Sequence, residues 1–310
     1  MRITNKTNLP EALVKCVLAD NRERGDSDYT VTELLAPPRQ RVLMNRHHNE
    51  LTQDVADMIY AYLGRVGHAL FEKARVDGDV VETRVKSKVS GFKISGQFDR
   101  LVQSDTLIDL KLMSVWEIVF GLKEEKIWQL NMYKYLAEQN GFRVKELAIL
   151  GILRDWSIGK AELARMQGKT DYPQKQVVWI PVPVKSEKEV IAYIKERISL
   201  HERAINTPNW LPECSDYDRW AKDDTWALHR DTRKSALRVM DDRDKLEQFA
   251  LDNNFAILDK DGRWEGRKGI YIEHRKGESV RCKHYCAAFP VCNQGQKIVA
   301  EASEKESEAA

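Results

Sequence analysis

The chain has 310 residues, of which 42% are hydrophobic and 32% charged, and its mean hydropathy is −0.54. This length is enough for one large or two modest domains, and the apolar content is enough for a buried core. No apolar run approaches the length of a membrane span, and the N-terminus lacks a basic-then-apolar secretory signal, so we expect a cytosolic protein with no membrane partner. With a net charge of +2, any nucleic-acid contact must come from local basic patches.

The first 50 residues are predicted to form an N-terminal helical segment. A helix is expected over 10–21, and a second helix begins near Thr30 or Thr32, with Glu33 in its first turn. The two prolines at 37 and 38 must end or restart that helix. The basic cluster that follows is either a solvated helix face or a strip that contacts phosphates; its members are Arg39, Arg41, Arg46, His47 and His48.

Apolar residues recur at helical spacing from 51 to 75 and predict a long helix. We expect the small residues Gly64 and Gly67 to let this helix lie close to a sheet and to bring His68 to it. Glu72 on the same helix and Glu82 on the next predicted strand, 80–85, are interpreted as structural or solvent-facing carboxylates.

Two alternating runs, 94–102 and 107–113, are joined by a turn at Ser104–Asp105 and predict a hairpin. Side chains two apart on a strand share a face, so Asp109 and Lys111 point the same way and Leu110 points to the opposite side. With Asp99 on the first strand, two carboxylates and a lysine converge. Carboxylates are preferred ligands of Mg²⁺ and Mn²⁺, and a lysine beside them can act on water and phosphate, so the group suits phosphodiester hydrolysis.

A helix over 124–139 places Gln129 and Tyr133 four residues apart on one face, from which both could reach the same cleft. Further strands are predicted at 146–155 and 176–184, separated by a long polar loop over 156–175. A helix follows over 186–205, and the composition shifts at Asn206. An isolated Asp-x-Lys triplet, histidine or helical Gln/Tyr pair would each be read as ordinary structure, so the interpretation depends on their combination.

In this order, His68, Asp99, Asp109, Lys111, Gln129 and Tyr133 resemble the motifs of the PD-(D/E)XK nuclease superfamily, in particular its RecB-type branch. The resemblance covers about 60–155. It implies an α/β fold with a restriction-endonuclease-like central mixed β-sheet flanked by helices. It also implies that His68, Asp99, Asp109 and the Leu110 carbonyl hold Mg²⁺ or Mn²⁺, that Lys111 acts on water and phosphate, and that Gln129 and Tyr133 position the substrate.

The same resemblance implies a metal-dependent DNA exonuclease that acts on DNA ends in recombination or repair, of a phage type working in the host cytoplasm. DNA, recombination proteins and helicases are its expected partners. Two alternatives stay open, a CRISPR-adaptation-type trimming nuclease and a non-cleaving nucleic-acid-binding module with a structural metal site.

Four of the five cysteines, Cys214, Cys282, Cys286 and Cys292, are expected in a C-terminal cysteine-bound subdomain. Cysteines of a cytosolic chain are read as reduced, metal-bound or buried. Four thiolates suit a [4Fe–4S] cluster or a zinc ion, and the paired knuckles typical of zinc are incomplete here. The remaining alternative is that the C-terminal trio packs as small hydrophobic side chains.

The pattern resembles the iron–sulfur staple of RecB-type nucleases, with one departure. In those relatives the remote cysteine precedes the nuclease motifs, whereas here Ala36-Pro37-Pro38 takes its place and Cys214 is expected to replace it. The domains predicted are therefore 1–50, 51–205 for the nuclease-type core, 206–298 for the cysteine-containing subdomain, and 299–310 for a disordered tail.

Overall fold

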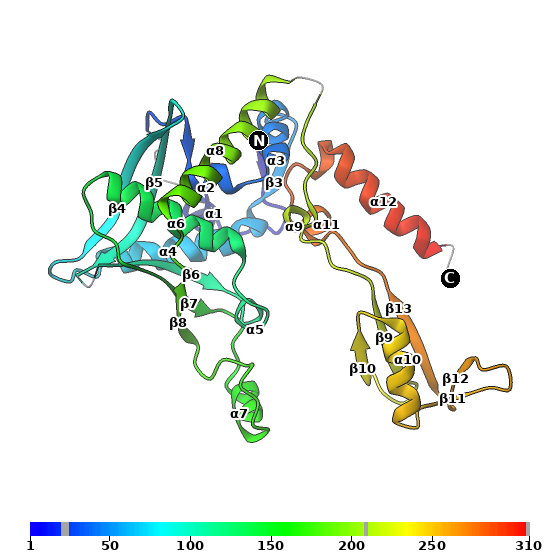
Figure 1. Ribbon diagram of the computed structural model, residues 1–310. Helices are drawn as coiled ribbons and strands as arrows, with labels where there is room; N and C mark the ends of the chain where they lie inside the picture. Colours follow the sequence, from blue (N-terminus) through cyan, green and yellow to red (C-terminus); the bar gives the residue numbers. More distant parts are fainter. Residues whose placement is uncertain (20–24, 104, 208–209, 308–310) are drawn as a thin grey trace. The chain divides into compact units, whose positions relative to one another are not determined.

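The computed structural model describes residues 1–19, 25–103, 105–207 and 210–307, with side chains as far as 302. The chain divides into two compact units, 1–212 and 213–310, which are described separately below (Figure 1). The predicted segments 1–50 and 51–205 belong to the same unit, so the boundary expected between them is wrong. The physical reason is that Val31 and Leu34 of the N-terminal segment are fully buried in the core of the first unit.

The first unit is built on a mixed sheet, as predicted, which has six strands because the short strand at 29–30, not among those predicted, joins it. Five strands follow the order β2–β5–β6–β7–β8, and β4 pairs with β5. The β6–β7 and β2–β5 pairs are parallel, and the others are antiparallel. The strands are β2 (Tyr29–Thr30), β4 (Val80–Val89), β5 (Phe92–Val102), β6 (Thr106–Met113), β7 (Glu146–Leu153) and β8 (Val177–Val182).

Helices pack on both faces of this sheet, and most begin where the sequence indicates. Thr30 and Ser186 each form a capping box, with Glu33 and Glu189, and so begin α2 and α8. The parallel β6–β7 pair needs a crossover, which contains α5 and α6. The helices of the first unit are α1 (Glu11–Leu18), α2 (Val31–Leu35), α3 (Pro38–Arg46), α4 (Ile59–Lys73), α5 (Trp116–Val119), α6 (Glu124–Gln139), α7 (Ile158–Met166) and α8 (Glu187–Asn206).

Three local predictions need correction. The helix expected from 51 begins only at Ile59, because 52–54 form the short strand β3, paired with β1 (Arg2–Thr4), and a 3₁₀ turn follows over 55–58. The long loop 156–175 contains the helix α7. Residues 20–21 of the first predicted helix and Ser104 of the hairpin turn lie outside the described residues.

The basic cluster near residue 40 has structural partners in the first unit. The Arg39 guanidinium donates to the carbonyls of Leu211 and Pro212, and Arg46 donates to the carbonyl of Ala204. Arg41 lies 3.6 Å from Glu33 and over the ring of Tyr29. These contacts tie α3 to the end of α8 and favour a structural role for these arginines over a strip that contacts phosphates.

The second unit contains a small sheet and a helix around their own core. Three antiparallel strands follow the order β10–β9–β13, and α10 covers them through Leu246 and Ala250. The elements are α9 (Asp216–Arg219), β9 (Thr225–Arg230), β10 (Arg238–Met240), α10 (Arg243–Asp252), β11 (Ala256–Leu258), β12 (Trp264–Gly266), β13 (Ile270–Arg275), α11 (Val280–His284) and α12 (Asn293–Ser307).

The tail predicted to be disordered, 299–310, is instead helical as far as Ser307, where the described residues end. Alanine and glutamate dominate this stretch, and both are strong helix formers. The Lys297–Glu301 pair, at 3.8 Å and four residues apart, supports the same helix. Within the described residues, no helix is both long and apolar enough to cross a membrane.

Candidate metal centre

Strand β5 lies at the centre of the site, and its two edges pair with different strands. One edge pairs with β4 along nearly its whole length. The other edge pairs with β2 at Ile94 and Ser95 and with β6 from Arg100 to Val102. Between these two pairings, β6 diverges from β5. Asp99 is the residue at which the two strands separate.

Three carboxylates lie in one row across β4, β5 and β6. One residue beyond the Arg100–Ile108 pair, the register of β5 and β6 places Asp109 opposite Asp99. The pairs on either side of Glu82 likewise place it opposite Asp99 on the other edge. Besides burial, the charge of Asp99 raises the pKa of both Glu82 and Asp109, so the three carboxylates lie close to one another. The row therefore concentrates negative charge at the point where the sheet opens.

Glu82 reaches this row with an unusual backbone. Its φ is +42°, a left-handed conformation that costs a residue with a Cβ on the order of 1–2 kcal/mol. Its carboxylate accepts a hydrogen bond of 2.6 Å from Gln97 Nε2 and is 17% exposed. Burial, followed by the charge of Asp99, raises the pKa of Glu82. Of the two alternatives predicted for these carboxylates, structural or solvent-facing, Glu82 is not solvent-facing, whereas Glu72 is exposed.

His68 completes a group of three potential metal ligands. It lies on α4 with its Nδ1 3.2 Å from Asp99 Oδ1 and 3.9 Å from Glu82 Oε1. Donor atoms of the three side chains all lie within 4.8 Å of one another. The hydrogen bond to Asp99 raises the pKa of His68, although burial opposes the charged form.

The glycines of α4 play a smaller part than predicted. A Cβ on Gly67 would lie 3.6 Å from Leu110 Cδ2, an ordinary contact, and one on Gly64 would meet nothing within 4 Å. Leu110 thus faces α4, and its backbone N–H donates to Asp99 Oδ2 at 2.7 Å. That hydrogen bond fixes the orientation of the Asp99 carboxylate.

Asp109 lies beside this group and is held by Lys111. The Lys111 ammonium lies 3.0 Å from Oδ1 and 2.8 Å from Oδ2 of Asp109, which is 2% exposed. Burial raises the pKa of Asp109. For Lys111 burial acts in the opposite direction, but the charge of Asp109 and the hydrogen bond to it outweigh burial and raise the pKa of Lys111. Asp109 was predicted as a metal ligand; here the three-ligand group takes Glu82 in its place.

Gln129 and Tyr133 lie on α6 and meet the face that carries Asp109 and Lys111. Gln129 Nε2 donates to the Tyr133 hydroxyl at 3.0 Å, so the two act as one polar unit. Burial raises the pKa of Tyr133 to about 12. The charge of Lys111 lowers this pKa and the charge of Asp109 raises it, so both groups lie close to the hydroxyl. The sequence order thus named the six predicted side chains that gather here, whereas Glu82 was ranked below them as a structural or solvent-facing carboxylate. Its signal in the sequence is only an acidic residue in an otherwise β-rich run.

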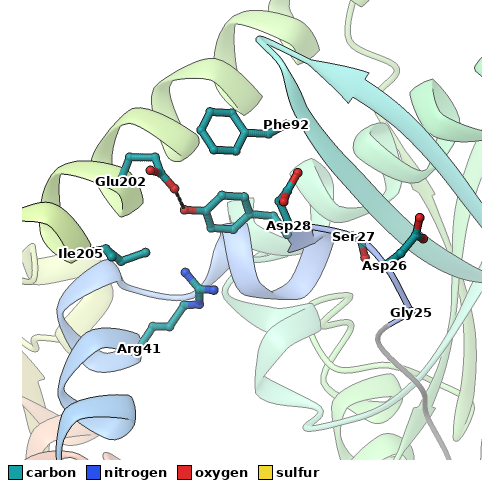
Figure 2. A pocket seen from close by; sticks show the side chains of 9 residues that line it. Gly25, Asp26, Ser27, Asp28, Arg41, Phe92, Glu202 and Ile205 are labelled. Atoms are coloured by element: carbon teal, nitrogen blue, oxygen red, sulfur yellow. Dashed lines mark hydrogen bonds between the residues drawn. The ribbon is translucent and has the colours of Figure 1, made fainter.

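Two cavities of the first unit lie elsewhere. One, of about 620 Å³, lies between residues 117–122 and β8. The other, of about 430 Å³, is lined by Asp26, Asp28, Arg41 and Phe92, among others, and Figure 2 shows the Tyr29 hydroxyl donating to Glu202 at its wall. None of the three potential metal ligands lines either cavity.

None of the four cysteines of the second unit forms a disulfide. Gln294 ties Cys214 to the others, because its side chain bonds both the N–H and the carbonyl of Cys214. The Gly295 N–H donates to Cys292 Sγ at 3.4 Å, and a Cβ on Gly295 would lie 3.7 Å from Cys282 Sγ. Burial, followed by the charges of Cys286 and Cys292, raises the pKa of Cys282, so these sulfurs are close enough to repel as thiolates.

Their spacing bears on which metal group they fit. Zinc–sulfur bonds of about 2.3 Å in a tetrahedron require sulfurs about 4 Å apart. Among the described residues, no three cysteine sulfurs lie within 4.8 Å of one another. The sulfurs are thus not gathered to the spacing of ligands on one zinc ion, and this spacing by itself does not distinguish zinc from an iron–sulfur cluster.

Comparisons with known proteins give limited information. No protein-family profile matches the sequence, and no curated protein matches it. The solved structure of SSO0001 aligns with a TM-score of 0.42 and 17% identity over 64% of this chain and 88% of that one. An alkaline exonuclease from Laribacter hongkongensis aligns with a TM-score of 0.34 and 13% identity over 62% of this chain and 86% of that one. At these values neither similarity assigns a function to this chain.

Proposed function

We propose that this protein is a metal-dependent nuclease that hydrolyses phosphodiester bonds of DNA. The observation that carries the proposal is the row of three carboxylates across β4, β5 and β6, flanked by His68 and by the buried Lys111–Asp109 pair. A row of this kind holds divalent cations, and a fixed ammonium beside it is suited to the charge of a phosphate.

The residues that would hold the cation are His68, Glu82 and Asp99. Two carboxylates and one imidazole suit Mn²⁺ at least as well as Mg²⁺, because nitrogen ligands are favoured by the softer ion. A bound cation supplies a lowered pKa for water and neutralises charge on the phosphate. The Leu110 N–H keeps one oxygen of Asp99 occupied, which leaves Oδ1, the oxygen nearest His68, directed at the site.

Lys111 is suited to stabilising charge. Its pKa is raised, so it stays protonated and can donate hydrogen bonds to a phosphate oxygen whose charge grows during attack. Deprotonating water would require the neutral amine, which the adjacent Asp109 disfavours. Asp109 therefore acts as the anchor that keeps the ammonium in place.

Tyr133 and Gln129 would position the substrate. The Tyr133 hydroxyl accepts a hydrogen bond from Gln129. It can donate its own proton to a phosphate oxygen of a substrate bound beside Lys111. Because its pKa is about 12, Tyr133 remains a hydrogen-bond donor at neutral pH. A neutral donor beside an ammonium can bind phosphate oxygens without adding negative charge.

The finer proposal is exonuclease action on DNA ends, in recombination or repair, of the phage type. The test is digestion of end-labelled linear DNA and closed circular DNA with Mg²⁺ or Mn²⁺. We expect the linear substrate to be degraded and the circle to persist. Lys111→Ala should lower the rate by about a thousandfold, in line with loss of a transition-state charge partner. An exposed lysine of α8, Lys188→Ala, provides the matched control. No cleavage by the wild type with either cation would overturn the proposal.

We also propose that the four cysteines of the second unit hold a [4Fe–4S] cluster. The support is the incomplete zinc-type knuckle pattern of the sequence, together with the closeness of Cys282, Cys286 and Cys292, whose charges add to burial in raising the pKa of Cys282 and Cys286. Such a cluster supplies positive iron centres that hold the cysteines as thiolates. The cluster would link Cys214, at the start of the second unit, to Cys282, Cys286 and Cys292 near its end.

A further inference from the structure

Two turns of the second unit lie side by side although they are far apart in sequence. The first turn connects β9 to β10, and the second, 267–269, precedes β13. Strand pairing aligns Arg230 with Ile270, and the Asp231 N–H donates to the Gly269 carbonyl at 2.9 Å. Gly269 has φ +76°, and a Cβ there would lie 3.1 Å from Asp231 Oδ2, so the turns are in close contact.

These turns concentrate positive charge. They contain five exposed cations and a single carboxylate, that of Asp231; the cations, called the two-turn basic patch below, are Arg230, Arg233, Lys234, Arg267 and Lys268. Among the described residues, none of the five forms an ion pair. At the other end of the same strands, Arg275 pairs with Glu273 at 2.7 Å, so the contrast occurs within one small sheet.

The backbone of the patch is fixed. The Arg233 N–H donates to the Arg230 carbonyl at 2.8 Å, and the Ile270 N–H donates to the Arg267 carbonyl at 2.8 Å. The Arg230 guanidinium lies 5.5 Å from the centre of the Phe255 ring. Unpaired like charges held close together repel one another, and a polyanion relieves that repulsion.

We propose that the two-turn basic patch binds the phosphate backbone of DNA independently of sequence. The inference rests on the proposed nuclease function, and it adds a second DNA contact outside the carboxylate row. Duplex DNA carries one charge per about 1.7 Å of its axis, a density that clustered arginines and lysines match. Arginine and lysine contacts to phosphate fix position without reading bases. The chain's net charge of +2 makes such a local patch necessary for DNA attraction.

The test is equilibrium binding of the full chain to a labelled DNA duplex without divalent cations, over a series of salt concentrations. The variant Arg233→Gln/Lys234→Gln/Lys268→Gln removes three cations and leaves Arg230, which packs on Phe255. The matched control, Lys169→Gln/Lys188→Gln/Lys195→Gln, removes three exposed lysines of the first unit. Each lost phosphate contact should reduce the slope of log affinity against log salt by about 0.9.

The patch variant should therefore lose up to about 3 from that slope and bind roughly tenfold or more weakly, while the control matches the wild type. Its single-turnover cleavage rate at saturating DNA should be unchanged. Equal slopes for the wild type and the patch variant would overturn the inference even if the wild type cleaves DNA. Patch-dependent binding by a wild type that never cleaves would overturn the nuclease proposal alone. If the patch binds polyglutamate more tightly than DNA, its ligand is an acidic peptide and the inference of DNA binding is overturned.

Discussion

Gly96 of β5 lies directly beneath the ring of Tyr133. A Cβ on Gly96 would approach Cδ1 and Cε1 of that ring to 2.8 Å and Val31 Cγ2 to 3.0 Å. The absence of a side chain at residue 96 therefore lets α6 bring Tyr133 down to the face of the sheet that carries Lys111. This close approach joins the packing of the core to the geometry of the site.

The first prediction follows from that contact. Gly96→Ala should destabilise the protein by about 1–3 kcal/mol, because an overpacked core must shift a ring or a strand. Urea unfolding measures the change. Gly64→Ala, in α4 with nothing within 4 Å, should instead stabilise by about 0.5–1 kcal/mol through helix propensity. Equal stability of Gly96→Ala and the wild type would show that the site tolerates a displaced Tyr133.

The second prediction concerns Glu82. Glu82→Gln should weaken Mn²⁺ binding by roughly tenfold or more, because it removes one of two carboxylates from the ligand group. Burial already raises the pKa of Glu82, so a neutral amide should be tolerated and the fold kept. Isothermal titration calorimetry measures the affinity. Glu72→Gln on α4 is the control, and equal affinities for the two variants would exclude Glu82 as a ligand.

The third prediction concerns the buried ion pair. Lys111→Met should cost about 3–5 kcal/mol in metal-free buffer, because it leaves the Asp109 carboxylate buried without its cation. Adding Asp109→Asn to the same chain should recover most of that loss, since the uncompensated charge is then gone. Chemical unfolding of both single variants and the double variant gives the coupling. A double variant no more stable than Lys111→Met would mean that Asp109 is already neutral in the folded protein.

The fourth prediction is a pH dependence of stability from His201. This residue of α8 is fully buried, with Nε2 3.4 Å from the Leu34 carbonyl, and burial lowers its pKa from 6.5 to about 4; the charges of Arg197 and Arg41 act in the same direction. The unfolded chain takes up a proton below pH 6.5, whereas the folded chain does so only near pH 4. Stability should therefore be retained above pH 6.5 and fall by roughly 3 kcal/mol between pH 6.5 and 4.

The measurement is the free energy of unfolding across that range for the wild type and for His201→Gln. The difference between the two proteins isolates the histidine from the many carboxylates that titrate nearby in pH. We expect that difference to shrink as the pH falls. A constant difference from pH 7 to pH 4 would contradict the lowered pKa.

The fifth prediction tests the cysteine cluster. Protein purified without oxygen should contain iron and absorb visible light, and Cys286→Ser should lose most of both. Cys16→Ser, an exposed cysteine of the first unit, is the control. Stoichiometric zinc in place of iron would overturn the proposed cluster. Neither metal would favour the alternative in which the trio packs as small hydrophobic side chains.

Local periodicity was sufficient to predict the elements that carry most of the site. Alternation in 107–113 placed Asp109 and Lys111 on one face, and helical spacing placed Gln129 and Tyr133 on another; both follow from the geometry of a single element. The helix 124–139 was predicted from its helical spacing and is confirmed, as is the mixed sheet, which the family resemblance implied. Loop 156–175 and the tail were mispredicted, because polar composition does not exclude a surface helix.

By itself, the sequence determined which side chains are available and which neighbours along one strand or helix share a face. Only the tertiary structure decided which strands lie side by side, and so which carboxylates meet. Glu82 joins Asp99 through the register of β4 and β5 and a left-handed backbone, and Asp109 becomes the partner of Lys111. Register between strands depends on pairing across the whole sheet, and no local pattern in the chain encodes it.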